Sequence, residues 1–265
     1  MKIGFVQFAP VLGKIDATLE KLSPLLDRAG EAELLVLPEL ANSGYAFRSL
    51  DEARKGAEKI GRGPFSTFLE EHCRARGIHI VAGVNERFQG RLYNSAVLVG
   101  PEGVQGTYRK LHLFKNEKDF FSPGDLGLPI FRIGGCHVGM LVCFDWIFPE
   151  AWRILALQGA DLIAHPANLV LPGLAQKAVP VHALTNRIFA VTANRVGSER
   201  GLTFTGNSLV ADPGGAVLVE GSASEDEVGL VDIQVDRARD KRVTDRNHIF
   251  QDRRPDQYTR LTRPG

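Results

Sequence analysis

The stretch from Gly139 to Asn168 most narrows the folds open to this chain, because it reads as a strand, a sharp turn, a helix and a second strand in direct succession. An apolar run from His137 to Val142 has the length and branched content of a buried strand, and it stops at Cys143. A helix is predicted next, with Pro149 in its first position and a closing glycine, on the pattern of Trp152, Leu155, Ala156 and Gly159. A strand from Leu162 to Ala164 follows, and this succession predicts an α/β fold.

The same alternation continues along the chain. Further strands are predicted at Ile3 to Phe8, Leu34 to Leu37, Ile78 to Val84, Tyr93 to Val99, Val104 to Tyr108, Ile130 to Ile133, Phe189 to Ala193, Ser208 to Ala211, Ala216 to Glu220 and Val228 to Ile233. Helical spacing of apolar residues precedes or follows several of them, around residues 19–29, 66–77 and 175–186. We expect one domain over residues 1–265, with sheets of mixed direction and a polar C-terminal arm from about residue 236. The strand order does not follow from the sequence.

Local signals at helix boundaries give two further expectations. Pro24 lies inside a helical pattern, so that helix should either kink or begin later than its apolar spacing suggests. Ser66 is the residue type that commonly caps a helix, and it is predicted to be the N-cap of the helix that ends at Gly77.

The charge and cysteine content exclude several classes of protein. The 32 basic and 31 acidic residues leave a net charge of +1, which offers no electrostatic attraction for nucleic acid or an anionic membrane and fits a small neutral substrate. The N-terminal MKIGFVQFAP runs into a strand without a leader pattern, and no apolar run has transmembrane length, so a cytoplasmic protein is expected. Three cysteines without C-x-x-C spacing and seven histidines without a paired pattern predict neither a disulfide framework nor a metal site.

Cys143 is the first candidate for chemistry. It stands on a strand-to-helix elbow at the carboxyl end of a strand, where exposed backbone N–H groups could hold an oxyanion. The alternative is plain packing, since a free cysteine usually behaves as a small buried hydrophobe. Charged residues after other strands bear on the choice: Glu39 follows the strand ending at Leu37, Lys110 follows the strand ending at Tyr108, and Glu117 lies in the next loop.

Three segments carry a resemblance to a known family: LPEL (Leu37 to Leu40), YRKLHLF (Tyr108 to Phe114) and VCFDWIFPE (Val142 to Glu150). In order and separation they resemble the Glu-Lys-Cys motifs of the nitrilase superfamily of carbon–nitrogen hydrolases, and the similarity extends over nearly the whole chain. It implies a four-layer α-β-β-α sandwich, with subunits pairing into a homodimer or a higher oligomer.

The resemblance also implies roles for individual residues. Cys143 would be the nucleophile, Glu39 the general base and acid, and Lys110, with the backbone N–H of Phe144, the stabiliser of the tetrahedral intermediate. Glu117 would orient the lysine or the substrate amide. Trp146, Tyr45 and Asn168 are placed by resemblance at the substrate, whereas Asp145 is expected to be a structural hydrogen-bonding residue.

The residue types suit this chemistry on their own. A thiol with a pKa near 8.5 is mostly protonated at neutral pH, so its attack needs a neighbouring carboxylate or ammonium, and Glu39 and Lys110 supply one of each. A thioester would form, water would hydrolyse it, and no cofactor is required.

The cysteine's flanking residues favour the aliphatic or ω-amidase branch, because Asp145 stands two residues after it and dedicated nitrilases often have Trp-Glu there. Hydrolysis of small nitriles through a thioimidate is the nearest alternative, followed by hydrolysis of N-carbamoyl amides. A catalytically silent binding module and a Cys-His protease using His112 or His165 also remain open. The physiological substrate does not follow from the sequence.

Overall fold

The computed structural model describes residues 1–262, and its elements alternate as the sequence predicts. The strands are β1 Lys2–Gln7, β2 Leu34–Val36, β3 His79–Phe88, β4 Arg91–Gly100, β5 Gly103–Arg109, β6 Ile130–Ile133, β7 Cys136–Met140, β8 Leu162–Pro166, β9 Phe189–Ala193, β10 Ser198–Glu199, β11 Leu202–Thr203, β12 Leu209–Ala211, β13 Val217–Glu220 and β14 Glu227–Asp232. The α-helices are α1 Ile15–Arg28, α2 Leu50–Lys55, α3 Pro64–Arg76, α4 Glu117–Phe120, α5 Pro149–Leu157 and α6 Leu174–Asn186. Short 3-10 helices are η1 Cys143–Ile147, η2 Val235–Ala238, η3 Pro255–Gln257 and η4 Thr259–Thr262.

Two six-stranded sheets form the body of the protein, in the orders β14-β1-β2-β3-β4-β5 and β13-β12-β9-β8-β7-β6. The central strands of each sheet are parallel, β1 with β2 and β3 in one and β7 with β8 and β9 in the other, while the flanking pairs are antiparallel. The parallel strands are connected through helices and the antiparallel ones mostly through hairpins.

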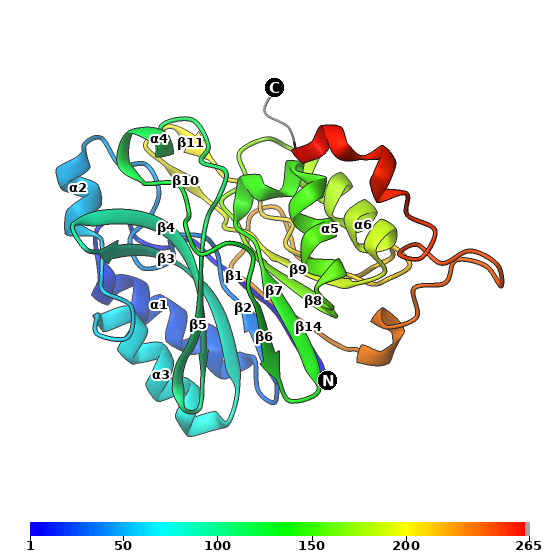
Figure 1. Ribbon diagram of the computed structural model, residues 1–265. Coiled ribbons are helices and arrows are strands. Elements are labelled where there is room, and N and C mark those ends of the chain that lie inside the picture. Colours follow the sequence, from blue (N-terminus) through cyan, green and yellow to red (C-terminus); the bar gives the residue numbers. More distant parts are fainter. Residues whose placement is uncertain (263–265) are drawn as a thin grey trace.

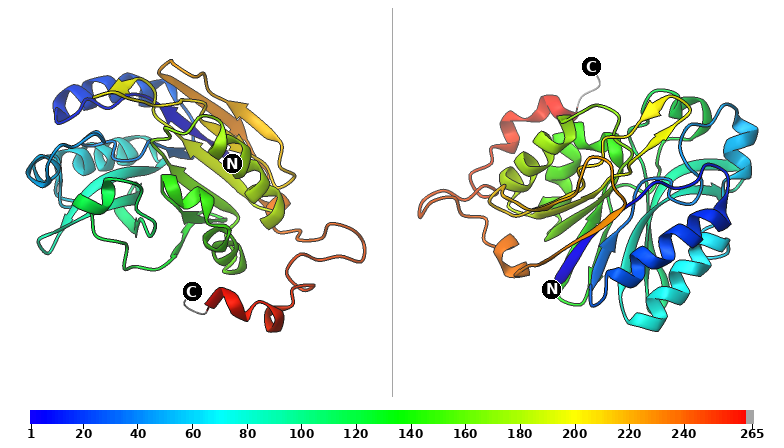
Figure 2. Two further views of the ribbon diagram at one scale, coloured as in Figure 1. Left: turned by 90° about the horizontal axis from the view of Figure 1, so that it is seen from above. Right: turned by 180° about the vertical axis from the view of Figure 1, so that it is seen from behind.

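The two sheets pack face to face with helices on both outer faces (Figures 1 and 2). Alternation along β2 shows the layering: Leu35 packs with the apolar side chains of α1 and α3, whereas Val36 packs into the core between the sheets. Over the second sheet, Trp152 of α5 and Val179 of α6 pack on the outer face and are continuous with the same hydrophobic cluster. The expected α-β-β-α sandwich is therefore confirmed.

The helix boundaries differ from the sequence-based expectation at one position. Helix α3 begins at Pro64 with Gly63 as its N-cap, so the prediction of Ser66 as N-cap is wrong. The buried carboxylate of Glu58 instead accepts the backbone N–H groups of Phe65 and Ser66. A carboxylate from the segment before the helix thus satisfies the free donors of this helix end.

Helix α1 begins at Ile15, four residues before the apolar spacing that starts at Leu19, and includes Pro24. The late-start alternative is therefore wrong. Its residues Leu22, Leu25 and Leu26 are buried, and this packing offsets the hydrogen bond that proline cannot donate.

Beyond β14 the chain crosses to the second sheet's helices. Arg239 forms an ion pair with Asp161 (3.2 Å), and residues 253–262 border a groove of about 530 Å³ together with α5 and α6. Figure 1 shows this last segment, in red, beside α5. Within residues 1–262, no helix is both long and apolar enough to span a bilayer.

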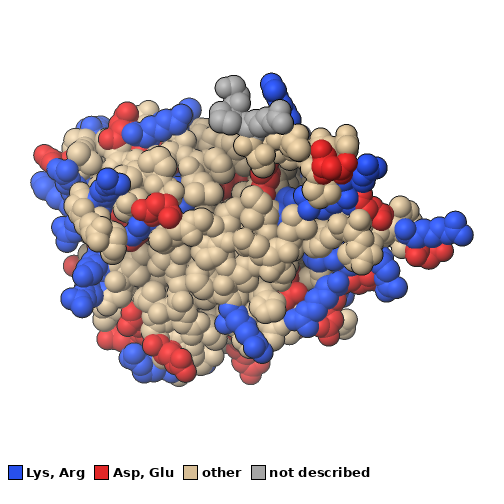
Figure 3. Space-filling view, viewed as in Figure 1, with Lys and Arg blue, Asp and Glu red and all other residues tan. Residues whose placement is uncertain are grey.

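Charged side chains are mixed in sign on the face shown in Figure 3, where they lie around the margin of a broad uncharged area. This face therefore carries no extended patch of a single sign.

Gly83 of β3 tests how tightly the end of the first sheet is packed. A Cβ at this position would lie 2.3 Å from the Cα of Glu39 and 2.6 Å from the carbonyl oxygen of Pro38. Gly83→Ala should therefore push the segment after β2 aside and lower the free energy of unfolding by about 1–3 kcal/mol, measured by urea denaturation. Gly135→Ala is the control, because nothing lies within 4 Å of its Cβ position. Equal stability of the two variants would contradict this packing.

Candidate active site

Cys143 lies at a sharp turn between β7 and α5. The strand ends at Met140, earlier than the predicted Val142, and Cys143 opens η1 with a φ of 44°. A positive φ is unfavourable for a residue with a side chain and persists only where surrounding contacts enforce it. Here the carboxylate of Asp145 accepts the N–H of Val142 (2.8 Å), and the N–H of Asp145 donates back to the Val142 carbonyl (3.1 Å).

Asp145 also joins this turn to the end of β5. Its carboxylate accepts the hydroxyl of Tyr108 (2.7 Å) and the ring Nδ1–H of His112 (2.7 Å), which stand on either side of Lys110 in the chain. Asp145 is fully buried. The fully buried carboxylate therefore fixes the cysteine turn relative to the lysine segment, as its predicted structural role required.

Glu39 enters the same space from the segment after β2. Its Oε1 accepts hydrogen bonds from Lys110 Nζ (2.7 Å) and Asn94 Nδ2 (2.7 Å). Its backbone carbonyl accepts the side-chain amide of Asn168 (2.9 Å). The other carboxylate oxygen, Oε2, is buried and has no hydrogen-bond partner within residues 1–262. A buried acceptor without a partner is costly, so it marks a position where a proton or a ligand can bind.

Lys110 is fully buried between two carboxylates. Its Nζ donates to Glu39 Oε1 (2.7 Å) and Glu117 Oε1 (2.8 Å). Burial lowers the pKa of Lys110, but Glu117 and Glu39 more than offset this and hold the pKa above its usual value. Burial raises the pKa of Glu117, and the lysine opposes that rise. The lysine is therefore a fixed cation.

The Cys143 thiol is 5% exposed. Burial, followed by the charge of Glu39, raises its pKa well above the usual value, while Lys110 and a backbone hydrogen bond from Asn168 act in the opposite direction. The thiol is thus protonated at neutral pH, with carboxylates close enough to influence it. The structure brings Glu39, Lys110, Glu117 and Cys143 together.

Neither candidate histidine is bound to the thiol. The carbonyl of Cys143 can only accept, so His165 Nε2 carries the hydrogen in their 2.9 Å contact, and Nδ1 faces the Thr192 hydroxyl (3.0 Å). Burial lowers the pKa of His165 to about 4. His112 is engaged with Asp145 and stacks on Phe148. This arrangement speaks against a Cys-His pair.

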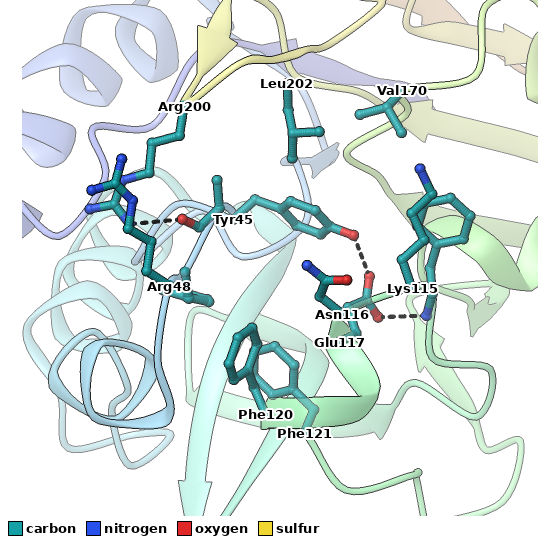
Figure 4. Close-up of a pocket in the computed structure, with 13 residues that line it drawn as sticks. Tyr45, Arg48, Lys115, Asn116, Glu117, Phe120, Phe121, Val170, Arg200 and Leu202 are labelled. Atoms are coloured by element: carbon teal, nitrogen blue, oxygen red, sulfur yellow. Dashed lines mark hydrogen bonds between the residues drawn. The ribbon is translucent and has the colours of Figure 1, made fainter.

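Two cavities adjoin the cluster. A cavity of about 400 Å³ is bordered by Tyr45, whose hydroxyl donates to Glu117 (2.8 Å), and its rim carries Arg48 and Lys115 (Figure 4). A much smaller one, about 10 Å³, lies against Cys143 and is bordered by Phe144, Trp146, Asn168 and their neighbours. Phe114 and Val170 border both cavities, which therefore adjoin each other.

The substrate-side residues predicted from sequence thus divide into two groups. Phe144, Trp146 and Asn168 border the space at the thiol, whereas Tyr45 lies in the larger cavity beside Glu117. The side-chain amide of Asn94 contacts Glu39 (2.7 Å) and Glu117 (3.5 Å). The sequence did not predict Asn94 as a site residue. Its signal was a polar residue inside the apolar run of β4. Within residues 1–262, no group of three or more His, Cys, Asp or Glu side chains is arranged to hold a metal ion.

Comparison with known proteins agrees with this geometry. The family model for carbon-nitrogen hydrolases matches residues 2–243. The chain belongs to the carbon-nitrogen hydrolase family. Membership in the nitrilase superfamily, predicted from the three motifs, is thereby confirmed, and the protein is an enzyme of this family.

Relatives of this carbon-nitrogen hydrolase carry both amidase and nitrilase names. A nitrilase from Pyrococcus abyssi is 49% identical over 98% of this chain and 100% of its own length. A 2-oxoglutaramate amidase from Bacillus subtilis is 33% identical over 97% of this chain and 98% of its own length.

Solved structures of an amidase from Nesterenkonia sp. share this fold. One has a TM-score of 0.81 at 28% identity, covering 98% of this chain and 96% of that one. Another, of a mutant of that amidase, has a TM-score of 0.81 at 27% identity, covering 98% of this chain and 96% of that one. It has the acetamide moiety of fluoroacetamide added covalently at its active-site cysteine.

The buried His165 predicts a pH dependence of stability. The pKa of His165 is about 4 in the folded protein and ~6.5 in an unfolded chain, so below pH ~6.5 the unfolded chain takes up a proton that the folded protein does not. The free energy of unfolding should therefore fall by about 3 kcal/mol as the pH drops to 4. Urea denaturation between pH 4 and 7 should show a shallower loss for His165→Gln than for wild type. If the free energy of unfolding falls equally with pH in both proteins, His165 does not cause the loss of stability.

Proposed function

We propose that this carbon-nitrogen hydrolase converts a small aliphatic amide into a carboxylic acid and ammonia. The observation that carries the proposal is the buried cluster of Glu39, Lys110 and Cys143, in which Glu39 Oε2 has no partner within residues 1–262. That oxygen is a free acceptor beside a thiol that must lose its proton to attack.

In the first half of the reaction, Cys143 Sγ attacks the amide carbon while Glu39 takes the thiol proton. The carbonyl oxygen becomes an oxyanion, and the Lys110 ammonium, fixed by Glu39 and Glu117, stabilises it together with the Phe144 backbone N–H. Glu39 then gives the proton to the departing nitrogen, so the C–N bond breaks, ammonia leaves and a thioester remains.

In the second half, Glu39 activates water to attack the thioester. The C–S bond breaks, the carboxylic acid leaves and the thiol regains a proton. Every proton is supplied by the substrates or by Glu39, so the reaction requires no cofactor. The adduct at the active-site cysteine of the Nesterenkonia amidase supports a cysteine nucleophile.

Nitrile hydrolysis is the second candidate, favoured by the nitrilase from Pyrococcus abyssi at 49% identity. Cys143 would attack the nitrile carbon and form a thioimidate, and two waters would complete the conversion to acid and ammonia. N-carbamoyl amide hydrolysis ranks third. A silent module ranks last, because the three reactive residues occur together.

We also propose that two copies pair through α5 and α6. Large apolar side chains are exposed on these helices, among them Ile154 and Leu157 on α5 and Val181 and Leu184 on α6. Exposed apolar surface grouped on adjacent elements is typical of an interaction site.

Ammonia release tests the reaction. Short aliphatic amides, dicarboxylic monoamides, N-carbamoyl amines and the matching nitriles form the panel. We expect release from amides, its loss in Cys143→Ala, and a roughly 10²–10⁴-fold lower rate for Glu39→Gln, because a general base is removed. Cys73→Ala, at a buried cysteine of α3, should keep wild-type activity. Ammonia release from nitriles alone would favour nitrile hydrolysis. No ammonia release from any compound in the panel would refute small-substrate hydrolysis.

Analytical ultracentrifugation tests the pairing. Val181→Asp places a charge on the exposed face of α6 and should convert a dimer into a monomer, because burying an unpaired charge is costly. Val243→Asp, at another exposed valine outside both helices, should leave the dimer intact. A wild-type monomer at micromolar concentration would rule the pairing out.

A further inference from the structure

A buried ion pair lies behind the wall of the larger cavity. Arg195 Nη1 and Glu199 Oε2 are 2.9 Å apart, and their side chains are 2% and 6% exposed. The guanidinium also lies over the ring of Phe204, 4.1 Å from its centre. Two charges buried together add little net stability, because desolvation offsets their attraction. The contribution of this pair therefore lies in the neighbouring groups that it holds in position.

Glu199 holds the backbone of the loop that carries Tyr45. Its Oε1 accepts the N–H groups of both Tyr45 (2.7 Å) and Ala46, while Arg195 occupies Oε2. Gly44 permits this approach: it has a φ of 79°, and a Cβ there would lie 2.9 Å from Glu199 Oε2. Both carboxylate oxygens are thus engaged, and the loop cannot shift without breaking two charge-assisted hydrogen bonds.

Tyr45 carries this constraint to the charged cluster. Its ring packs edge-on against Phe204 (6.0 Å between centres), and its hydroxyl donates to Glu117 Oε1, the oxygen that also accepts Lys110 Nζ. Figure 4 shows Tyr45 crossing the cavity with its hydroxyl directed at Glu117. The hydrogen bond from Tyr45 lowers the pKa of Glu117 and so favours its ionised form.

We propose that Glu199 is a positioning residue for the hydrolysis: by holding the Tyr45 backbone, it keeps the Tyr45 hydroxyl on Glu117 and Glu117 on Lys110. This inference rests on the proposed function for its role in the reaction. The contacts themselves, from Glu199 through Tyr45 to Glu117, do not depend on which substrate the enzyme uses.

Glu199→Gln breaks this arrangement in either orientation of the new side chain. If the amide oxygen faces the loop, its NH₂ group faces the Arg195 guanidinium, so two donors oppose each other. If the amide is turned around, NH₂ faces the N–H groups of Tyr45 and Ala46. We expect Tyr45 to move off Glu117, whose pKa then rises further.

The pH dependence of Cys143 alkylation by iodoacetamide, followed by peptide mass spectrometry, is the primary measurement. The charge of Glu117 acts on the Cys143 thiol. The rate of alkylation plotted against pH should therefore show an inflection at low pH, where Glu117 titrates. In Glu199→Gln this inflection should move up by about half a pH unit or more. In parallel, kcat for amide hydrolysis should fall roughly tenfold, since small displacements of catalytic groups are costly. Tyr45→Phe should reproduce the shift, and the double variant should show no more than either single one.

Glu58→Gln is the matched control. Glu58 is another buried carboxylate that accepts two backbone N–H groups, at the start of α3, and it does not border either cavity. It should lower the melting temperature without moving the inflection. If Glu199→Gln does not fold, as judged by circular dichroism, Arg195→Lys replaces it. Lysine keeps the positive charge but lacks the planar guanidinium, whose two Nη atoms bind Glu199 and the Pro10 carbonyl.

Two results would overturn the proposal: an unshifted inflection in Glu199→Gln, or effects of Glu199→Gln and Tyr45→Phe that add fully. If wild type releases no ammonia from any substrate while the inflection still shifts, the positioning contacts stand and the proposed function fails. The two failures are therefore distinguishable.

Discussion

The buried ammonium of Lys110 is the constraint on which the rest of the site depends. It is fully enclosed and has two carboxylates within hydrogen-bonding distance. An enclosed cation requires such partners, but two carboxylates leave one excess negative charge beside Cys143. That charge adds to burial in keeping the thiol protonated. The resting site thus holds a neutral thiol whose pKa Glu39 influences, and the Oε2 atom of Glu39 has no partner in the described chain. The proposed reaction uses this oxygen as the proton acceptor.

Two strained positions place Cys143 and Glu39 in this space. Cys143 (φ 44°) and Leu40 (φ 48°), directly after Glu39, both lie in the left-handed region. Such conformations survive only where the surroundings fix them. For Cys143 this is achieved through Asp145, and for Glu39 through the close approach of Gly83 and the amide of Asn168. The sandwich therefore supplies rigid strand ends, and buried polar side chains set the final geometry.

The sequence predicted what depends on local pattern. Strand periodicity predicted the α/β class, and the position of Glu39, Lys110 and Cys143 after strands made each a candidate, while the resemblance of their three motifs to the nitrilase superfamily implied the cluster that the structure brings together. Contacts between distant residues were beyond reach: Asn94 bonds to Glu39, 55 residues away, and Glu199 to Tyr45, 154 away. At the start of α3 the Ser66 prediction failed for a related reason, because the buried side chain of Glu58, outside the helix, accepts the free N–H groups there. Neither spacing nor propensity encodes which buried polar groups satisfy one another, because that depends on the completed packing.

The charge arrangement also determines which residue can move protons in the proposed reaction. Lys110 is held as an ammonium by two carboxylates, so it is a poor acid and acts by its charge. His165 is occupied by the Cys143 carbonyl and is neutral. The proton that the leaving nitrogen needs must then be the one Glu39 takes from the thiol. A nitrile would require the same transfer to its nitrogen. Amide and nitrile substrates therefore place equal demands on the charged cluster. Discrimination between them has to arise from the walls of the cavities, and Phe114 and Val170 border both the space at the thiol and the larger cavity.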